Sequence, residues 1–311
     1  MNHETRNPNL TPEFFEIIKD CKHLLKEDPV LFARLFIEFL KKYILLPAEE
    51  FIDNFSMPNN FGIDEHLMEK IRPFFQFLFH DYFRVSVKGI NNLPLKSGAL
   101  IVSNHSGCLP YDAVMIHLGI YNHHKHKRLS RMLVDDFAYR IPLLRKVLDH
   151  VGAVKASPEN AKRLISQDQL VCVFPEGVAG ISKEFSERYK LQKFGKGGFI
   201  KLSLETGAPI IPCAVIGAEE IHPIIWKSEK WGKAFGLPFF PITVTFPWLG
   251  PLGLIPFPTK WTIYFGKPIH FKEPAKARFD KKTVDHLTLK VKEQVQHMID
   301  IGLKKRKSVW E

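Results

Sequence analysis

A histidine and an aspartate stand close together in residues 104–112, directly after the short apolar run 99–103. An alcohol is a poor nucleophile at neutral pH and needs a base within hydrogen-bonding reach, and imidazole has a suitable pKa for that role. A carboxylate that binds the other ring nitrogen can fix the tautomer and stabilise the imidazolium. His105 is therefore a candidate general base, and Asp112 is a candidate partner that orients it.

Other interpretations of this segment are weighed beside that one. His105 could simply end a strand while Asp112 caps the helix that follows. Cys108 could be proposed as a covalent nucleophile. A serine nucleophile fits poorly, because the chain contains no G-x-S-x-G elbow.

A second motif, Phe-Pro-Glu-Gly at 174–177, ends another apolar run. Ligands of open α/β sheets gather beyond the carboxyl ends of the strands, so Glu176 is expected on the same edge as His105. Gly177 would let a substrate approach the backbone closely. The alternative is that Glu176 is a turn carboxylate that pairs with a nearby lysine.

The elements that must position these residues can be predicted from hydrophobic periodicity. Short apolar runs predict strands at 85–89, 99–103, 131–134, 151–154, 170–174, 209–216, 242–246 and 261–265. Helical patterns occupy 137–150, a segment that starts at Ser157 or Pro158, a segment from 199 that stops at Gly207, and about 284–298. This alternation predicts an α/β sheet with helices on its faces.

Helical patterns also precede residue 84, starting at Thr11, near Pro29, and across 67–82. Their apolar stripes could pack on the core, lie on a bilayer, or do both. We predict an amphipathic helical region at 1–83, an α/β domain at 84–274, and a C-terminal helix with a basic tail at 275–311. That tail is either solvated or in contact with anionic lipid.

The composition narrows the class of partner. The chain has 311 residues and a net charge of +11, which suits nucleic acid, anionic lipid or a phosphate-bearing substrate. Phenylalanine dominates the aromatic residues, 26 against 7 Tyr and 5 Trp, and this favours a membrane interface. No zinc finger, basic heptad helix or aromatic RNA-binding signature is present, so we predict no nucleic-acid partner.

The cellular compartment and the type of membrane association are predicted from features that the sequence does not contain. Four scattered cysteines without a CxxC pair favour a reducing compartment, and the polar first residues argue against secretion. The longest uncharged run, 234–259, holds six prolines and is expected to be strand and loop packed on the domain, where it could also contact the headgroup region of a membrane. Lysines and arginine interleave the histidines of 123–126, so no metal site is expected. We predict a peripheral protein on the cytoplasmic side of a membrane.

The order of the motifs resembles the glycerolipid acyltransferase superfamily, which includes the lysophosphatidate acyltransferases. That superfamily carries N-H-x-x-x-x-D, then a motif with glycine and arginine, then F-P-E-G, then a proline-containing apolar strand. This chain shows Asn104-His105 with Asp112, then Gly152, then 174–177, then 208–212, in agreement from about residue 84 to 272. The resemblance implies a twisted, mixed and largely parallel sheet flanked by helices, with an N-terminal helical layer. It also implies that His105 is the general base, and that Glu176 and Gly177 shape the acceptor pocket.

This sequence departs from the superfamily pattern at three places. Asp112 follows His105 by seven residues instead of five, and a variant subfamily with N-H-S-G-x-x-P-x-D matches better. Val-Ala-Gly at 178–180 stands where phosphate-handling members have Thr or Ser and Arg. The second motif has Lys155 and no arginine. The last two changes weaken the case for a glycerol-phosphate acceptor and leave open a neutral acceptor or a lysophospholipid held differently.

Four of the cations that follow the second motif lie close in sequence to Gly195, Gly197 and Gly198: Arg188, Lys190, Lys193 and Lys196. Together with the nearby glycines, they could hold the phosphate of the acceptor or of coenzyme A. The alternative is a solvated basic loop.

The predicted function is O-acyl transfer. A fatty acyl group would pass from acyl-CoA or acyl carrier protein, as co-substrate, to a hydroxyl of a lysophospholipid or related glycerolipid, with no bound cofactor or metal. Two alternatives use the same scaffold: a non-catalytic lipid-binding protein, and a thioesterase that uses water as the acceptor.

Overall fold

The computed structural model describes residues 63, 65–107, 109–139, 148, 151–234, 236–271 and 279–311. The helices predicted from Thr11 and Pro29, the proposed nucleophile Cys108, and most of the predicted helix 137–150 lie outside the described residues. The chain divides into two compact units, Met1–Asn54 and Phe55–Glu311, and everything below concerns the second.

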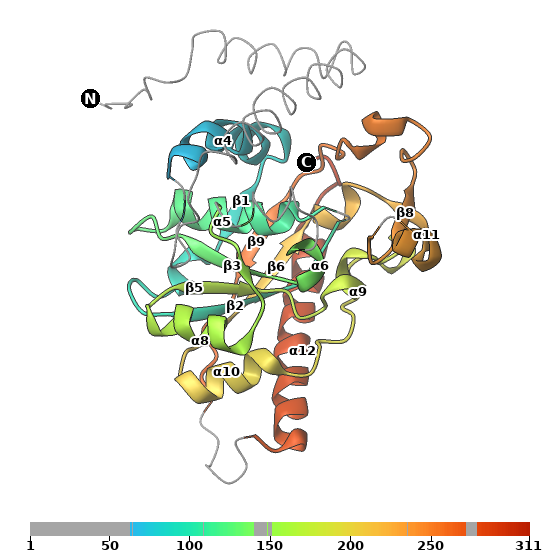
Figure 1. Ribbon diagram of the computed structural model, residues 1–311. Helices are drawn as coiled ribbons and strands as arrows, with labels where there is room; N and C mark the ends of the chain where they lie inside the picture. Colours follow the sequence, from blue (N-terminus) through green and yellow to red (C-terminus); the bar gives the residue numbers. More distant parts are fainter. Residues whose placement is uncertain are drawn as a thin grey trace, which may run out of the picture. The chain divides into compact units, whose positions relative to one another are not determined.

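The second unit is built on a seven-stranded sheet in the order β1-β9-β6-β2-β5-β3-β4 (Figure 1). Only β6 and β9 pair antiparallel, and the other neighbours are parallel. The predicted mixed, largely parallel sheet flanked by helices is therefore confirmed. In sheet order, the strands are β1 Ser86–Lys88, β9 Thr262–Phe265, β6 Ile210–Ile216, β2 Ala99–Ser103, β5 Leu170–Val173, β3 Ser130–Val134 and β4 Val154–Lys155.

The central strands are apolar throughout because both faces of the sheet are covered. Every residue of β2 and β6 is buried, as expected for strands inside a parallel sheet with helices on each side. In register, Val102 lies opposite Val173 and Ser103 lies opposite Cys213. The ends of β2 and β5 thus reach the same edge, where the histidine and glutamate motifs begin.

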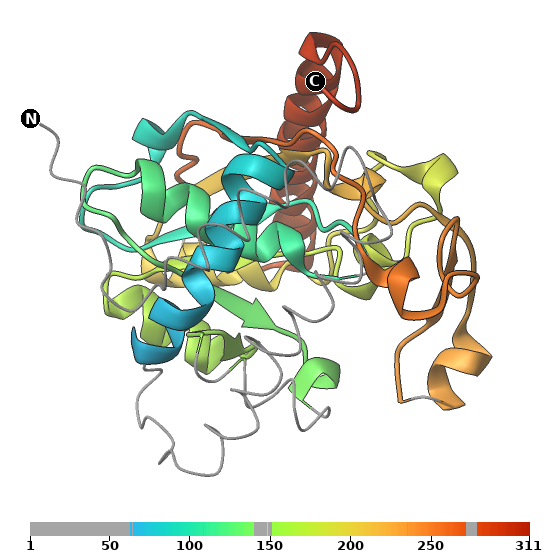
Figure 2. The same cartoon turned by 90° about the horizontal axis from the view of Figure 1, so that it is seen from above.

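Helices cover the two faces of the sheet. On one face, α8 Pro158–Ser166, α10 Gly198–Thr206 and α12 Lys281–Lys305 share an apolar cluster with Leu100, Val102 and Ile216. On the other face lie α4 Glu65–Phe77, the π-helical turn η2 Leu78–Tyr82 and α5 Tyr111–His123. Figure 2 looks down on α4 and α5. Gly119 of α5 lies directly against the side chains of Val87 and Ile263.

Local sequence signals fix several helix ends. Ser157 caps α8 by accepting a hydrogen bond from the Asn160 N–H at 3.1 Å, and Pro158 occupies the first turn, as predicted. Gly207 ends α10 with a φ of 73°, also as predicted. The predicted helix at 137–150 begins as α6 Asp136–Tyr139.

The strand predicted at 151–154 is wrong in its position. Residues 151 and 152 form a turn, and β4 starts only at Val154. Gly152 has a φ of 76°, which an extended strand does not adopt. The turn glycine therefore delays the strand to Val154–Lys155.

A smaller lobe projects beside the main sheet. Its antiparallel strands are β7 Ile224–Ser228 and β8 Phe240–Thr243, with α11 Glu229–Ala234 between them and the 3-10 turn η6 Gly250–Leu254 after them. The sequence patterns missed β7 and α11. The strand expected at 242–246 ends at Thr243, whose side-chain oxygen accepts from the Phe246 N–H at 2.8 Å and closes a turn.

Four further short turns connect these elements: α9 Val178–Ile181, η3 Ile90–Asn92, η4 Phe185–Glu187 and η5 Ala218–Glu220. Among the helices in the described part of the chain, none has the length and apolar character needed to cross a bilayer.

Candidate active site

Asn104 holds the end of β2 against β6. Its side-chain amide donates to the Val215 carbonyl at 3.0 Å, and its side-chain oxygen accepts from the Val215 N–H at 2.8 Å. The buried side chain thus makes the pair of hydrogen bonds to β6 that the backbone of one more β2 residue would make. This contact fixes the position of the next residue, His105.

The structure brings the two predicted catalytic residues together. His105 Nδ1 lies 2.8 Å from Asp112 Oδ2, and the aspartate is fully buried. Because a carboxylate only accepts, we assign the proton to Nδ1, which leaves Nε2 of the neutral ring unprotonated. No described residue hydrogen-bonds to Nε2, and the imidazole is 15% exposed. The arrangement is that of a general base held by a carboxylate.

Backbone amides hold the carboxylate of Asp112 in place. Oδ2 also accepts from the Ser106 N–H at 2.9 Å, and Oδ1 accepts from the Ala113 N–H at 2.8 Å. Asp112 lies in the first turn of α5, where unpaired N–H groups favour an anion. The interpretation of Asp112 as a helix cap is wrong in its position, because Pro110 is the N-cap residue and Asp112 lies inside the first turn.

The loop between the two residues explains how seven positions can separate them. Gly107 has a φ of 78°, a left-handed conformation that suits glycine, and it lies against Ile221. Pro110 then precedes the first turn of α5. The chain reverses direction at this loop, so the carboxylate of Asp112 reaches the imidazole of His105 despite the wider spacing.

Packing restricts the imidazole on its other sides. The ring of Phe174 stacks on that of His105, with centroids 4.3 Å apart and an angle of 25° between the planes. A Cβ on Gly180 would lie 2.8 Å from the Cβ atoms of both His105 and Glu176. The glycine of the unusual Val-Ala-Gly segment is thus required by this close approach.

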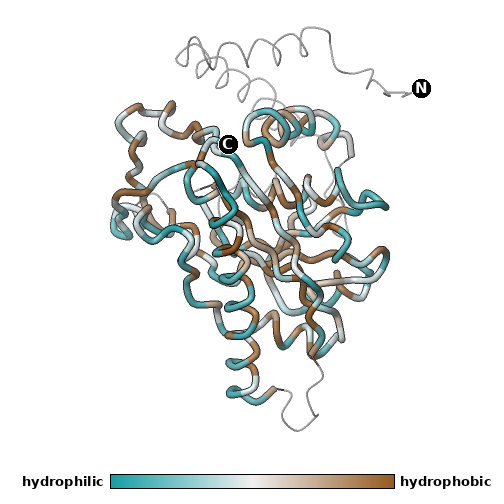
Figure 3. The backbone as a smooth tube through the Cα atoms, turned by 180° about the vertical axis from the view of Figure 1, so that it is seen from behind, coloured by the Kyte–Doolittle hydropathy of each residue, from teal (hydrophilic) through white to brown (hydrophobic). Residues whose placement is uncertain are grey.

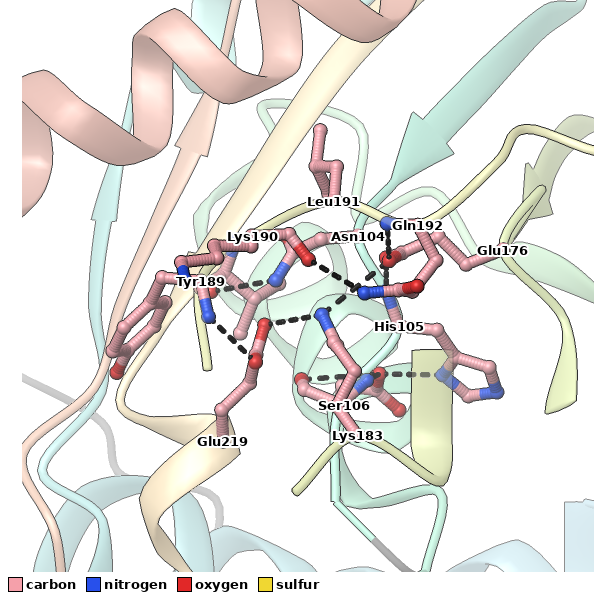
Figure 4. Close-up of polar contacts among 12 residues, drawn as sticks. Asn104, His105, Ser106, Glu176, Lys183, Tyr189, Lys190, Leu191, Gln192 and Glu219 are labelled. Carbon is pink, nitrogen blue, oxygen red and sulfur yellow. Dashed lines mark hydrogen bonds and ion pairs between the residues drawn. The ribbon is translucent and has the colours of Figure 1, made fainter. Parts of the chain in front are cut away.

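Glu176 lies beside His105 but is occupied by internal contacts (Figure 4). Its Oε1 accepts from the His105 N–H at 2.9 Å, and its Oε2 accepts from the Gln192 N–H at 2.7 Å. Oε2 also lies 3.3 Å from Lys183 Nζ, and the side chain is fully buried. These contacts correspond to the alternative interpretation, a turn carboxylate paired with a lysine. That Glu176 shapes an acceptor pocket stays a prediction.

Lys183 is a site residue that the sequence patterns missed. Its ammonium is 3% exposed and lies between Glu176 and Glu219, 2.9 Å from Glu219 Oε1. Glu219 also accepts from the Tyr189 N–H at 2.7 Å. Burial raises the pKa of Glu219, and Lys183 opposes that rise. Among 44 basic residues, nothing local distinguishes this lysine.

The buried polar contacts continue toward the C-terminus. The Tyr189 hydroxyl accepts from the Gly217 N–H at 2.9 Å and lies 3.3 Å from Arg306. Arg306 forms an ion pair with Glu220 at 2.6 Å. One residue of the predicted basic tail, Arg306, is therefore partly buried and paired, whereas Lys304, Lys305 and Lys307 are exposed.

The remaining predicted binding residues lie at the surface near this network. Arg188 is exposed, and its guanidinium lies over the Phe185 ring at 4.1 Å. Lys190 and Lys193 are exposed, and no described residue pairs with their ammonium groups. The Gln192 N–H between them reaches Glu176, which ties this segment to the site. A phosphate-binding role for these three cations stays a prediction.

Gly177 offers close access to the backbone. It has a φ of 55°, and a Cβ placed there would meet no atom within 4 Å.

In the described ranges, no three His, Cys, Asp or Glu side chains lie close enough together to bind a metal ion.

Sequence comparison adds the family. A family model described as Acyltransferase matches residues 84–216, which contain both motifs. An uncharacterised protein of Mycobacterium leprae is 41% identical over 254 residues, covering 81% of this chain and 69% of the relative. This chain belongs to the acyltransferase family. It is an acyltransferase, the activity that the resemblance of its motifs implied.

Two further comparisons place this acyltransferase among relatives. The 1-acyl-sn-glycerophosphate (LPA) acyltransferase PlsC from Thermotoga maritima shares its fold, with a TM-score of 0.54, 18% identity, and coverage of 89% of this chain and 97% of PlsC. A bovine protein named DGAT1/2-independent enzyme synthesizing storage lipids is 26% identical over 230 residues, which are 72% of this chain and 60% of the relative.

Proposed function

We propose that this acyltransferase moves a fatty acyl group from an acyl thioester to a hydroxyl of a lysophospholipid or related glycerolipid. The donor would be acyl-CoA or acyl carrier protein, and the enzyme would act as a peripheral protein on the cytoplasmic face of a membrane. The observation that carries the proposal is the 2.8 Å contact between His105 Nδ1 and Asp112, which leaves Nε2 of the ring unpaired among the described residues.

The residues support a direct transfer without an enzyme-bound acyl group. His105 Nε2 removes the proton of the acceptor hydroxyl as its oxygen attacks the thioester carbonyl carbon. The tetrahedral intermediate then collapses, the carbon–sulfur bond breaks, and the imidazolium returns the proton to the departing sulfur. Asp112 stabilises the imidazolium throughout. A base of this kind contributes roughly 10²–10⁴-fold to the rate.

The surroundings of the dyad favour an acceptor without a free phosphate. Gly180 is packed against His105, so that position presents no cation. Lys183, the nearest buried cation, is already shared by two carboxylates. Arg188, Lys190 and Lys193 are exposed and would hold a phosphate of the donor carrier. The name of the bovine relative, which refers to storage lipids, is in keeping with a neutral acceptor.

The test measures coenzyme A release from a long-chain acyl-CoA, with acyl carrier protein donors in parallel. Each donor is offered lysophospholipids, monoacylglycerol, diacylglycerol or no acceptor. We expect acceptor-dependent release that falls roughly 10²–10⁴-fold in His105→Ala. His286→Ala, on the exposed surface of α12, is the matched control and should not differ from wild type.

Two results would contradict the proposal. Full transfer by His105→Ala would exclude the dyad as the base. Release of free fatty acid at the same rate with and without acceptors would show that water is the acceptor, which makes the enzyme a thioesterase.

A further inference from the structure

The lobe formed by residues 224–257 exposes an unusual set of apolar side chains; we name it the aromatic lobe. Trp248 is 67% exposed, and two other tryptophans of the lobe are about half exposed. Figure 3 colours several stretches of its backbone as hydrophobic. The exposed large apolar side chains are Ile225, Trp226, Trp231, Val244, Trp248, Leu249 and Leu254.

Four aromatic side chains of this lobe, Trp226, Trp231, Phe240 and Phe246, form a connected set, and Trp248 is exposed on the same lobe. Ring centroids are 5.9 Å apart between Trp226 and Trp231, 5.9 Å between Trp231 and Phe240, and 5.6 Å between Phe240 and Phe246. Single exposed hydrophobic residues are common on soluble proteins. A contiguous group marks a surface that binds something.

The aromatic lobe is attached to the elements of the active site (Figure 1). Ile224 and Phe239 pack with Ile181 of α9, the turn that directly follows Glu176 and Gly177. Lys227 Nζ donates to the Ser182 carbonyl at 2.8 Å. The loop after His105 also approaches the segment that leads into the lobe, because a Cβ on Gly107 would lie 3.2 Å from the side chain of Ile221. The lobe is therefore held beside the catalytic histidine.

The charges around the aromatic lobe favour an anionic surface as its partner. Across 221–260 there are four lysines and one glutamate, and 234–259 is uncharged. Lys230 and Lys233 are exposed on α11, the short helix that also carries Trp231. Tryptophan prefers the membrane–water interface, and lysines near it attract anionic headgroups. Protein–protein interfaces are instead depleted in lysine.

We propose that the aromatic lobe docks this enzyme on anionic bilayers by inserting its tryptophans at the headgroup level. Docking there would present a membrane lipid to His105, and this consequence rests on the proposed function. The docking itself does not depend on which acyl group or acceptor the enzyme uses.

The first test measures binding of the full chain to vesicles by flotation. Vesicles are phosphatidylcholine alone or phosphatidylcholine with phosphatidylglycerol. We expect Trp248→Ser to weaken partitioning about tenfold. We expect the double variant Lys230→Glu/Lys233→Glu to weaken binding to the anionic vesicles at least tenfold, and to have little effect on the neutral ones.

Matched controls separate the lobe from general surface effects. Trp310→Ser removes a tryptophan that is 55% exposed at the C-terminus. Lys281→Glu/Lys282→Glu makes the same charge change at the exposed start of α12. Both should bind anionic vesicles within about twofold of wild type. Equal losses in the controls, or wild-type binding by Trp248→Ser, would overturn the docking proposal.

A second assay separates docking from catalysis. Acyl transfer is measured on vesicles and also without them, using a short-chain acyl-CoA and a short-chain acceptor below its micellar concentration. Lobe variants should lose activity only on vesicles. Equal loss in both assays would overturn docking as the role of the lobe.

Wild-type protein that binds vesicles through the lobe but transfers no acyl group would uphold docking and contradict the proposed function. A dimer that Trp248→Ser dissociates, without vesicle binding by wild type, would assign the lobe to self-association instead.

Discussion

Lys183 Nζ lies 3.3 Å from Glu176 Oε2 in the interior of the protein, next to the backbone of His105. The other oxygen of Glu176 accepts the His105 N–H at 2.9 Å. The glutamate of the Phe-Pro-Glu-Gly motif therefore joins a buried cation to the backbone of the proposed base. Its contacts are those of a positioning residue.

The first prediction concerns this buried ion pair. Lys183→Met would leave Glu176 and Glu219 without their shared cation in a dry environment. We expect a loss of about 3–5 kcal/mol in the free energy of unfolding, because breaking a buried pair on one side leaves an uncompensated charge. Urea unfolding of both proteins measures this loss.

A surface pair of similar geometry provides the control. Lys162 and Glu205 lie 2.7 Å apart, and both are about half exposed. Lys162→Met should cost at most about 1 kcal/mol. In the double variant Lys183→Met/Glu219→Gln, part of the lost stability should return. Equal costs for the buried and the surface lysine would show that the network does not stabilise the fold.

The second prediction concerns Asp112, whose carboxylate sets the tautomer of His105. In Asp112→Asn the side chain is neutral, and an NH2 at the position of Oδ2, the atom that contacts both the Ser106 N–H and His105 Nδ1, would donate to Nδ1. This favours the tautomer with the proton on Nε2, which cannot act as a base. We expect kcat to fall roughly 10³–10⁴-fold with little change in KM.

Steady-state kinetics and circular dichroism together check this prediction. Asp136→Asn is the control, because Asp136 is exposed and pairs with Lys155 only at the surface. A variant that keeps its fold and its full kcat would show that Asp112 only holds the first turn of α5 and the His105 loop in place.

The third prediction concerns the close packing of Gly180. In Gly180→Ala, the new methyl would meet the Cβ atoms of His105 and Glu176 at 2.8 Å, so the imidazole must shift. We expect a stability loss of about 1–3 kcal/mol, as for other overpacked sites, together with a lower kcat. Gly198→Ala is the control, since open space surrounds that position on α10. If neither change lowers the melting temperature, the close packing around Gly180 does not require a glycine.

Much of the scaffold could be predicted because its signals are local. Continuous apolar runs identified the central strands β2 and β6, and a serine followed by proline identified the start of α8. The pairing of His105 with Asp112 was also accessible, since both belong to one short loop.

The rest of the site depends on contacts between distant segments, which no local pattern encodes. Lys183 meets Glu219 across 36 positions, and Asn104 binds Val215 across 111. Two elements of the aromatic lobe, β7 and α11, were missed for a different reason. Strand β7 begins only after a turn at 221–223 and pairs with a proline-containing partner, so the usual strand signals are diluted.

The fourth prediction concerns stability in acid. Burial lowers the pKa of His117 to about 4, from an ordinary value of 6.5, although its Nδ1–H donates a hydrogen bond to the Ser130 carbonyl at 3.1 Å, which opposes the shift. Between these two values the unfolded chain binds more protons at this residue than the folded one, so stability rises with pH across that window. The contribution of His117 is therefore complete above about pH 6.5 and is lost as the pH falls toward 4. The loss approaches roughly 3 kcal/mol if the full shift applies.

Urea unfolding of wild type and His117→Gln at pH 7 and pH 4.5 tests this sign. The glutamine variant cannot take up the proton, so its stability should fall less on acidification than that of wild type. His80, His124 and His222 also have pKa values lowered by burial, and they add to the acid loss in both proteins. His286→Gln, which changes an exposed imidazole, should follow wild type. If His117→Gln loses as much stability as wild type between the two pH values, His117 does not titrate in the way its burial requires.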